Sequence, residues 1–370
     1  MRLRSGPTAI MPRITPLALR TTPNLARLLP AVRDIASARN ELRWLRDHVD
    51  GSPPRNHARA RRRLTALCSQ RGRGVPLQYL LGTQPFGDLD VRCQPGVLIP
   101  RPETEAYTVH LARLLRSGRL LGGGRGRALR VVDFCTGTGC IPLLLASLLA
   151  PAFPELHVHG VDISPAALSL SRLNLRAALA TSQIPPPSPS QSVAFHHGDL
   201  LSAPWLERVL PDLIPKCDVL VSNPPYVSPQ TWRFGRGELS YSTRKFEPKL
   251  ALVPRDVPDL PRGCWQEDIF YAALLDAAGV LGPTIVLFEF GDVAQGKRIL
   301  ELALRHPFCQ DAEFEFWKDC PDLESLADNG ADTETEVHVK DQAGLDRVVP
   351  IRGSGNVRSI VIRRPATRTV

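Results

Sequence analysis

Apolar and polar positions follow two different periods along this chain. Over residues 31–73 apolar side chains recur at three- and four-residue spacing, as at Ala38, Leu42 and Leu45, which predicts helices. From residue 129 onward, short apolar runs alternate with helical stretches. The predicted strands are 129–134, 156–161, 193–196, 219–222 and 284–290. The predicted helices are 141–150, 165–180 and 268–278. This alternation predicts an α/β fold with a doubly wound, mostly parallel sheet.

Segments outside this alternation predict the rest of the architecture. Residues 85–100 predict a β-hairpin linker, and 313–317 and 358–362 predict two antiparallel strands at the end of the sheet. The glycine-rich stretch 122–126 and the proline-rich stretch 184–190 predict surface loops. Residues 319–355 are polar, acidic and weakly patterned, and predict one long loop.

The amino terminus has the composition of a targeting segment. Six arginines precede the first acid, Asp34, among leucines, threonines and prolines, which is typical of a mitochondrial transit peptide. Pro12, Pro16 and Pro23 interrupt any long amphipathic helix in this stretch, and a basic tail without an address is the alternative. We expect a transit segment over 1–30, a helical substrate-docking domain over 31–84, the linker over 85–100 and a catalytic domain over 101–370. This address would place the protein in the mitochondrial matrix, and without it the protein would remain in the cytoplasm.

Composition narrows the class of protein. No apolar stretch of the 370 residues approaches the eighteen or so that a membrane span needs. The formal net charge of +9 suggests an acidic partner such as RNA, while scattered solvated arginines explain it equally well. The eight cysteines form no C-x-x-C pair and show no ligand-like spacing with histidine, so we expect reduced thiols and no metal site.

Three consecutive predicted strands end in residues suited to an adenosine-bearing ligand. The first leads into Cys135, Thr136, Gly137, Thr138 and Gly139, where glycines let the backbone approach a ligand closely. The second ends at Asp162, whose carboxylate can accept both ribose hydroxyls, or can merely cap the following helix. The third is followed by Asp199 and Leu200, where an acid could accept from an adenine amino group. Together they predict an adenosine site without a phosphate cradle.

The fourth predicted strand runs into Asn223, Pro224, Pro225 and Tyr226. The prolines stiffen the turn, so that the Asn223 side-chain oxygen and a main-chain carbonyl can accept both hydrogens of an –NH2 group. Tyr226 offers a flat face on which a planar amide or amine can pack. Next to an adenosine site, this turn predicts an N-methyltransferase that uses S-adenosyl-L-methionine.

The chain resembles the glutamine N5-methyltransferases that modify peptide chain release factors. The resemblance extends from about residue 35 to the carboxyl terminus. It is carried by the motifs YLLG (79–82), VLIPRPETE (97–105), DFCTGTG (133–139), VDISPAAL (161–168), VSNPPY (221–226) and FEP (246–248). It implies a class I S-adenosyl-L-methionine-dependent methyltransferase fold with a small helical domain in front. It also implies methylation of the glutamine of a release factor's Gly-Gly-Gln loop.

The resemblance also assigns roles to individual residues. It implies cofactor contacts at Asp133, along 135–139, and at Asp162, Asp199 and Leu200, and it places Asn223 beside the cofactor. It implies that Asn223, Pro224, Pro225 and Tyr226 bind the substrate glutamine. Cys135 stands where the family commonly has glycine, and Leu200 where it often has an aromatic residue. An adenine N6-methyltransferase acting on DNA or RNA shares the Asn-Pro-Pro-Tyr motif and is the alternative, and a non-catalytic scaffold is a third reading.

Overall fold

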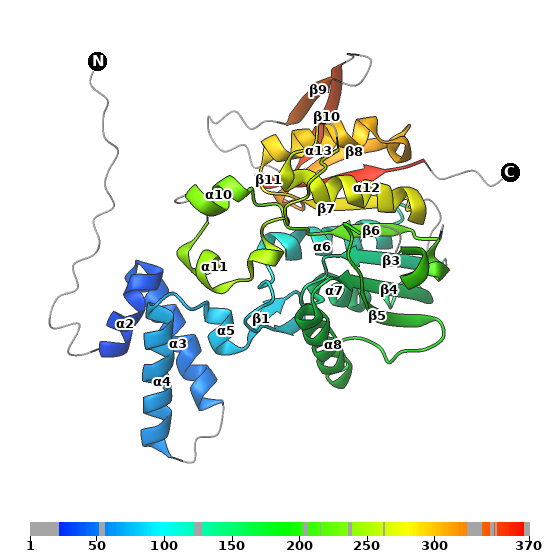
Figure 1. The fold of residues 1–370 in the computed structure, drawn as a ribbon. Coiled ribbons are helices and arrows are strands. Elements are labelled where there is room, and N and C mark those ends of the chain that lie inside the picture. Colours follow the sequence, from blue (N-terminus) through cyan, green and yellow to red (C-terminus); the bar gives the residue numbers. More distant parts are fainter. Residues whose placement is uncertain are drawn as a thin grey trace, which may run out of the picture. The chain divides into compact units, whose positions relative to one another are not determined.

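The computed structural model describes residues 22–51, 56–121, 128–202, 206–214, 216–235, 239–261, 263–323, 335–340, 344 and 346–365. The described chain divides into two compact units. The helical unit comprises the residues up to Thr83 together with Ser240–Phe246, and the catalytic unit comprises Gln84–Leu239 together with Glu247–Val370 (Figure 1). Most of the predicted transit segment, the glycine-rich stretch 122–126 and parts of 319–355 lie outside the described residues.

The helical unit is built from short amphipathic helices. They are α2 (Pro23–Val32), α3 (Ile35–Asp50), α4 (His57–Gly72), α5 (Leu77–Leu81) and α11 (Tyr241–Phe246). Side chains cap two of them, because Asp34 accepts from the Ser37 N–H and Asn56 accepts from the Ala58 N–H. The buried side chains are Leu28, Leu29, Ala38, Leu45, Cys68 and Leu77. Because Leu28 is fully buried, the domain boundary expected at residue 30 falls inside a packed helix.

The catalytic unit contains a nine-stranded sheet in the order β5-β4-β3-β6-β7-β11-β8-β10-β9. Its strands are β3 (Ala128–Phe134), β4 (Glu155–Asp162), β5 (Gln191–His197), β6 (Val219–Ser222), β7 (Ile285–Glu289), β8 (Glu313–Cys320), β9 (Glu336–Lys340), β10 (Asp346–Arg352) and β11 (Ser354–Arg363). The first five are parallel to one another, and β11 is antiparallel to both β7 and β8. Strand order reverses between β3 and β6, so ligands are expected at the carboxyl ends there.

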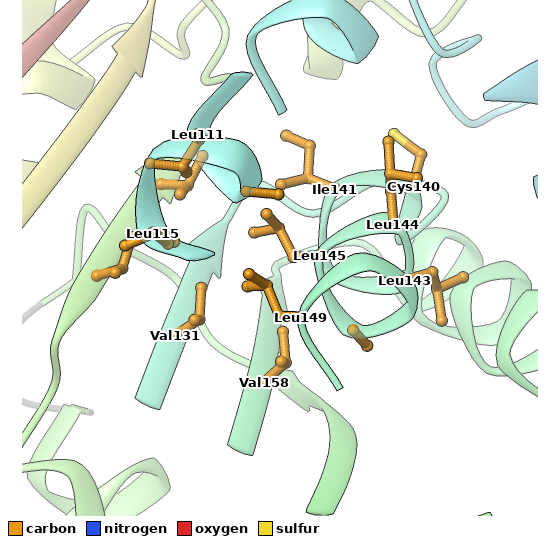
Figure 2. Packing of buried hydrophobic residues seen from close by; sticks show 14 of the residues in the cluster. Leu111, Leu115, Val131, Cys140, Ile141, Leu143, Leu144, Leu145, Leu149 and Val158 are labelled. Carbon is orange, nitrogen blue, oxygen red and sulfur yellow. The ribbon is translucent and has the colours of Figure 1, made fainter. Parts of the chain in front are cut away.

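Helices cover both faces of this sheet. The helices of the catalytic unit are α6 (Pro102–Arg116), α7 (Cys140–Leu149), α8 (Pro165–Ala180), α9 (Leu206–Val209), α10 (Pro229–Phe234), α12 (Ile269–Leu281) and α13 (Val293–Arg305). On one face Val131 and Val158 pack against Leu111 of α6 and Leu145 of α7 (Figure 2). On the other face, residues one position along the strands, such as Val132, pack against α12 and α13. The predicted fold class, a mostly parallel doubly wound sheet with an antiparallel last strand behind a helical domain, is confirmed.

One element prediction is wrong. Residues 319–355 were expected to form one long loop, but the described part contains β9 and β10, paired as an antiparallel hairpin, and β10 joins β8 in parallel. In β9, the buried Val337 and Val339 alternate with exposed polar residues. This short period-two pattern was outweighed by the acidic composition around it.

The other connections follow the sequence pattern. Strands β1 (Thr83–Phe86) and β2 (Leu89–Arg92) form a two-stranded sheet, and 93–101 continue without regular structure. All eight cysteines are free, and six are buried. In the described residues no helix is both long and apolar enough to cross a bilayer, and no group of three or more metal-ligating side chains is found.

Candidate functional site

An open pocket lies at the carboxyl ends of β3, β4 and β6 and encloses about 1110 Å³, part of it open to solvent. It receives residues from the carboxyl ends of the four strands β3, β4, β5 and β6. The predicted site residues on its wall are Cys135, Thr136, Gly137, Thr138, Asp162, Asp199, Leu200, Asn223 and Pro225. The wall does not include Asp133, Gly139, Pro224 or Tyr226. These four belong to the same motifs as the lining residues.

The loop between β3 and α7 is shaped by left-handed backbone conformations. Cys135, Gly137 and Gly139 have φ angles of 61°, 56° and 79°. Cys135 therefore adopts the conformation for which glycine is favoured, and it does so at a cost of about 1–2 kcal/mol. A Cβ at Gly139 would lie 2.8 Å from Phe195, so this glycine is required by packing. A Cβ at Gly137 would meet its nearest described atom, the Cys135 oxygen, only at 4.0 Å. The backbone at Gly137 thus borders open space, as close approach of a ligand requires.

Asp162 holds this loop in place. One carboxylate oxygen accepts from the Gly137 N–H and the other from the Ser164 N–H, each at 2.8 Å. The cap of α8 is Ser164, whose hydroxyl accepts from the Ala167 N–H. Because a carboxylate offers about four lone-pair sites, Asp162 retains acceptors for a ligand at the pocket wall. Burial raises the pKa of Asp162, while the backbone hydrogen bonds oppose that shift.

Asp133 is placed differently from the other predicted cofactor residues. It is fully buried, and neither of its carboxylate oxygens has a hydrogen-bond partner among the described residues. Burial raises its pKa well above the usual range, which favours the neutral acid. Asp133 is therefore not among the residues that line the pocket.

Asp199 is already engaged in the structure. Its carboxylate accepts from the Leu201 N–H and the Ser202 hydroxyl and forms an ion pair with Arg255 at 2.8 Å. Arg255 and Leu200 also line the pocket. The third strand end therefore contributes an acid with a fixed orientation and an apolar neighbour.

A wall of the pocket comes from two segments that are far apart in the sequence. The buried Glu247 accepts from the Ile99 N–H at 3.1 Å and from the Arg101 guanidinium at 2.7 Å. Residues 96–101 line the pocket beside this contact, together with Pro248, Leu250 and Ala251. The motifs VLIPRPETE and FEP thus meet through one buried ion pair, a pairing that neither motif predicts alone.

The Asn-Pro-Pro-Tyr turn is held by residues that the sequence did not single out. The Asn223 amide nitrogen donates to the Thr104 hydroxyl at 3.2 Å, and Thr104 donates to the Glu289 carboxylate at 2.6 Å. The Tyr226 hydroxyl donates to the other oxygen of Glu289 at 3.4 Å. An acid at the carboxyl end of the otherwise apolar strand β7 is the signal that could have pointed to Glu289.

Comparisons with known proteins agree with this geometry. No protein-family model matches the chain. A probable mitochondrial MRF1 N(5)-glutamine methyltransferase of Schizosaccharomyces pombe is 33% identical over 79% of this chain and 89% of its own length. The corresponding mitochondrial protein of Saccharomyces cerevisiae is 34% identical over 66% of this chain and 68% of its own.

A bacterial relative and a solved structure complete these findings. The release factor glutamine methyltransferase of Bacillus cereus is 35% identical over 63% of this chain and 70% of its own length. The N-terminal domain of human METTL16 bound to SAH covers 80% of this chain and 82% of that chain, with 11% identity and a TM-score of 0.42. The chain therefore belongs to the release factor glutamine methyltransferase family, and it is an S-adenosyl-L-methionine-dependent protein-glutamine N5-methyltransferase.

Proposed function

We propose that this enzyme methylates the glutamine of the Gly-Gly-Gln loop of a mitochondrial peptide chain release factor. The names of the two fungal relatives, which call them mitochondrial MRF1 methyltransferases, support the organelle and the substrate. The arginine-rich, acid-free residues 1–33 support a mitochondrial address. Because α2 begins at Pro23 and packs into the helical unit, we place the end of that address before Pro23.

We assign the pocket to S-adenosyl-L-methionine, whose sulfonium supplies an electrophilic methyl group. Asp162 would accept from the ribose hydroxyls, Gly137 would leave room for close approach of the ligand, and Leu200 would offer an apolar contact. The open space at Gly137 and the free lone pairs of Asp162 are the observations that fit this cofactor.

The observation that carries the substrate assignment is the direction of the Asn223 amide. Its –NH2 group is committed to Thr104, so its oxygen is the end left for a ligand at the pocket wall. This oxygen and the Pro224 carbonyl would accept the two N–H bonds of the substrate amide, and Tyr226 would pack on the amide plane.

These acceptors favour the reaction because the substrate nitrogen becomes positive as it forms its bond to the methyl carbon. Bound S-adenosyl-L-methionine would supply the methyl group and keep the electrons of the carbon–sulfur bond on its sulfur, and the substrate nitrogen would release one proton to water. No base is needed beforehand, since the proton becomes acidic only as the new bond forms. Holding the nitrogen in line with the methyl group supplies the remaining acceleration.

Replacing Asn223 by alanine should lower kcat on the release factor by about 10²–10³-fold, because one acceptor of the developing charge is lost. The cofactor Kd, measured by calorimetry, should change little. Radiolabelled methyl incorporation, with mass spectrometry locating one methyl on the glutamine, measures the effect. The exposed Gln230→Ala variant is the matched control and should behave as the wild type.

The same assay tests the substrate. A release factor whose Gly-Gly-Gln glutamine is replaced by alanine should accept no label, and duplex DNA should accept none. Methylation of DNA in place of the release factor would establish the adenine methyltransferase alternative. Near-normal turnover by Asn223→Ala with cofactor bound would contradict the assignment of the turn.

A further inference from the structure

A buried hydrogen-bond chain leads from the end of β7 to the Asn-Pro-Pro-Tyr turn. Glu289 and Thr104 are 1% and 2% exposed, and Asn223 lies at the pocket wall. The hydroxyl of Thr104 stands between the other two, 2.6 Å from a carboxylate oxygen of Glu289 and 3.2 Å from the amide nitrogen of Asn223. Although Thr104 and Glu289 are 185 residues apart in the chain, both are buried behind the proposed substrate clamp.

We propose that Glu289 is a positioning residue that acts through Thr104 to fix which end of the Asn223 amide faces the substrate. The proposal deepens the proposed function and rests on it. It assigns Glu289 and Thr104 a role in the reaction without contact with the reacting atoms.

The direction of these hydrogen bonds follows from which of the three side chains can donate a proton and which can only accept one. An ionised carboxylate has no proton to donate, so the single hydroxyl proton of Thr104 points to Glu289. The Thr104 oxygen can then only accept, and the Asn223 end that faces it must be the –NH2 group. The Asn223 oxygen is thereby turned away from Thr104 and is available to accept from the substrate amide. With the amide reversed, two donors would face the two hydrogens of the substrate –NH2, and the clamp would repel it.

Several groups surround Glu289 and keep its carboxylate in this role. Glu103, Thr104 and Tyr107 face it from α6, Tyr226 from the turn and Arg358 from β11, and the charge of Arg101 also reaches it. The Tyr271 hydroxyl of α12 donates to the Glu289 main-chain oxygen at 2.7 Å. Burial raises the pKa of Glu289 to about 7, while the hydrogen bond from Thr104, the nearby Tyr107 hydroxyl and the charge of Arg358 oppose the shift.

Protonation of Glu289 should reverse the direction of the hydrogen bonds from Glu289 through Thr104 to Asn223. Below its pKa, Glu289 can donate to the Thr104 oxygen, and the Thr104 proton is then free to point at Asn223. That arrangement favours the Asn223 oxygen at Thr104 and withdraws the acceptor from the substrate. We therefore expect kcat to fall as the pH drops below about 7 and to level off above it.

Two variants test the relay at Thr104. Thr104→Val keeps the size of the side chain and removes the hydroxyl, so kcat on the release factor should fall about 10- to 100-fold because the clamp is misoriented. Thr104→Ser restores the hydroxyl and should return kcat to within a few-fold of wild type. The cofactor Kd and the melting temperature, measured alongside, should stay close to wild type in the serine variant.

A double-mutant cycle and a pH profile distinguish a positioning role of Thr104 and Glu289 from a merely structural role. In the Asn223→Ala background, Thr104→Val should lower kcat little further, because the amide that Thr104 orients is gone. Glu289→Gln cannot ionise, so the acidic fall of kcat near pH 7 should disappear even if the plateau is lower. Additive losses in the cycle, or an acidic fall that persists in Glu289→Gln, would overturn the inference.

The outcomes also distinguish this inference from the proposed function. A wild-type enzyme that leaves the release factor unmethylated overturns the proposed function and the inference with it. An active wild type with an equally active Thr104→Val variant overturns the inference alone.

Discussion

The two units of this protein use charge in opposite ways. Residues 1–83 and 240–246 contain 18 Lys and Arg against 4 Asp and Glu, whereas the rest of the chain contains 28 against 33. The excess of positive charge in the whole protein therefore belongs to the sequence of the helical unit. On α3, the exposed Arg39, Arg43 and Arg46 follow one another at one-turn spacing and form a stripe along the helix.

In the catalytic unit, several arginines instead form ion pairs with specific acids. Arg101 pairs with Glu247, Arg255 with Asp199 and Arg298 with Asp268, and the first two pairs stand at the pocket. Charge there orders loops and walls. In the helical unit Arg71 pairs with Glu41, but the stripe of Arg39, Arg43 and Arg46 is exposed to partners. From this difference we propose that the helical unit docks the partner, while the catalytic unit holds the pocket.

The largest expected effect is on the stability of the helical unit, and it tests whether α2 belongs to the packed core of that unit. Leu28→Ala should destabilise the helical unit by about 2–5 kcal/mol, because Leu28 is fully buried in its small core. Hydrogen exchange measured by mass spectrometry should show the loss in the helical unit, with cofactor binding preserved. Ile35→Ala, at a side chain 44% exposed, is the control and should cost far less. If Leu28→Ala left hydrogen exchange in the helical unit unchanged, α2 would not belong to its core, and the targeting segment would extend beyond α2.

The next effect tests the arginine stripe. Replacing Arg39, Arg43 and Arg46 together by alanine should raise KM for the release factor about tenfold at low salt, since long-range attraction to an acidic partner is weakened. The difference from wild type should shrink as salt is added, and the cofactor Kd should not change. Alanine at the exposed Arg116, Arg119 and Arg176 of the catalytic unit removes the same charge and serves as the control. An equal loss in both triple variants would remove the distinction between the units.

The smallest effect concerns backbone strain in the catalytic unit. Cys135→Gly should change the free energy of unfolding by less than about 1 kcal/mol, because relief of the left-handed conformation is offset by greater freedom of the unfolded chain. Denaturant unfolding measures this difference, and Cys135→Ala, which retains a Cβ, should show no relief. A loss above about 2 kcal/mol in the glycine variant would show that the thiol itself supports the loop.

Local patterning predicted the elements that position the site. The apolar run before Asn223 became β6, and the run before Cys135 became β3, each followed by a residue at the pocket wall. Such runs are predictable because burial on both faces of a parallel sheet leaves a continuous apolar signal. The β9–β10 hairpin was missed because its alternation is short and surrounded by acidic residues.

The sequence by itself determined the fold class and the order of chemistry-bearing residues along it, since periodicity and strand-end motifs are local properties. It also placed Asn223, Asp162 and the glycines of the first loop in one reaction. Only the tertiary structure decided how these groups are held. Glu247 joins Ile99 and Arg101, and Glu289 reaches Asn223 through Thr104, because a buried carboxylate must find its donors wherever the fold brings them. Partners of that kind are chosen by packing across the chain, which no local pattern records.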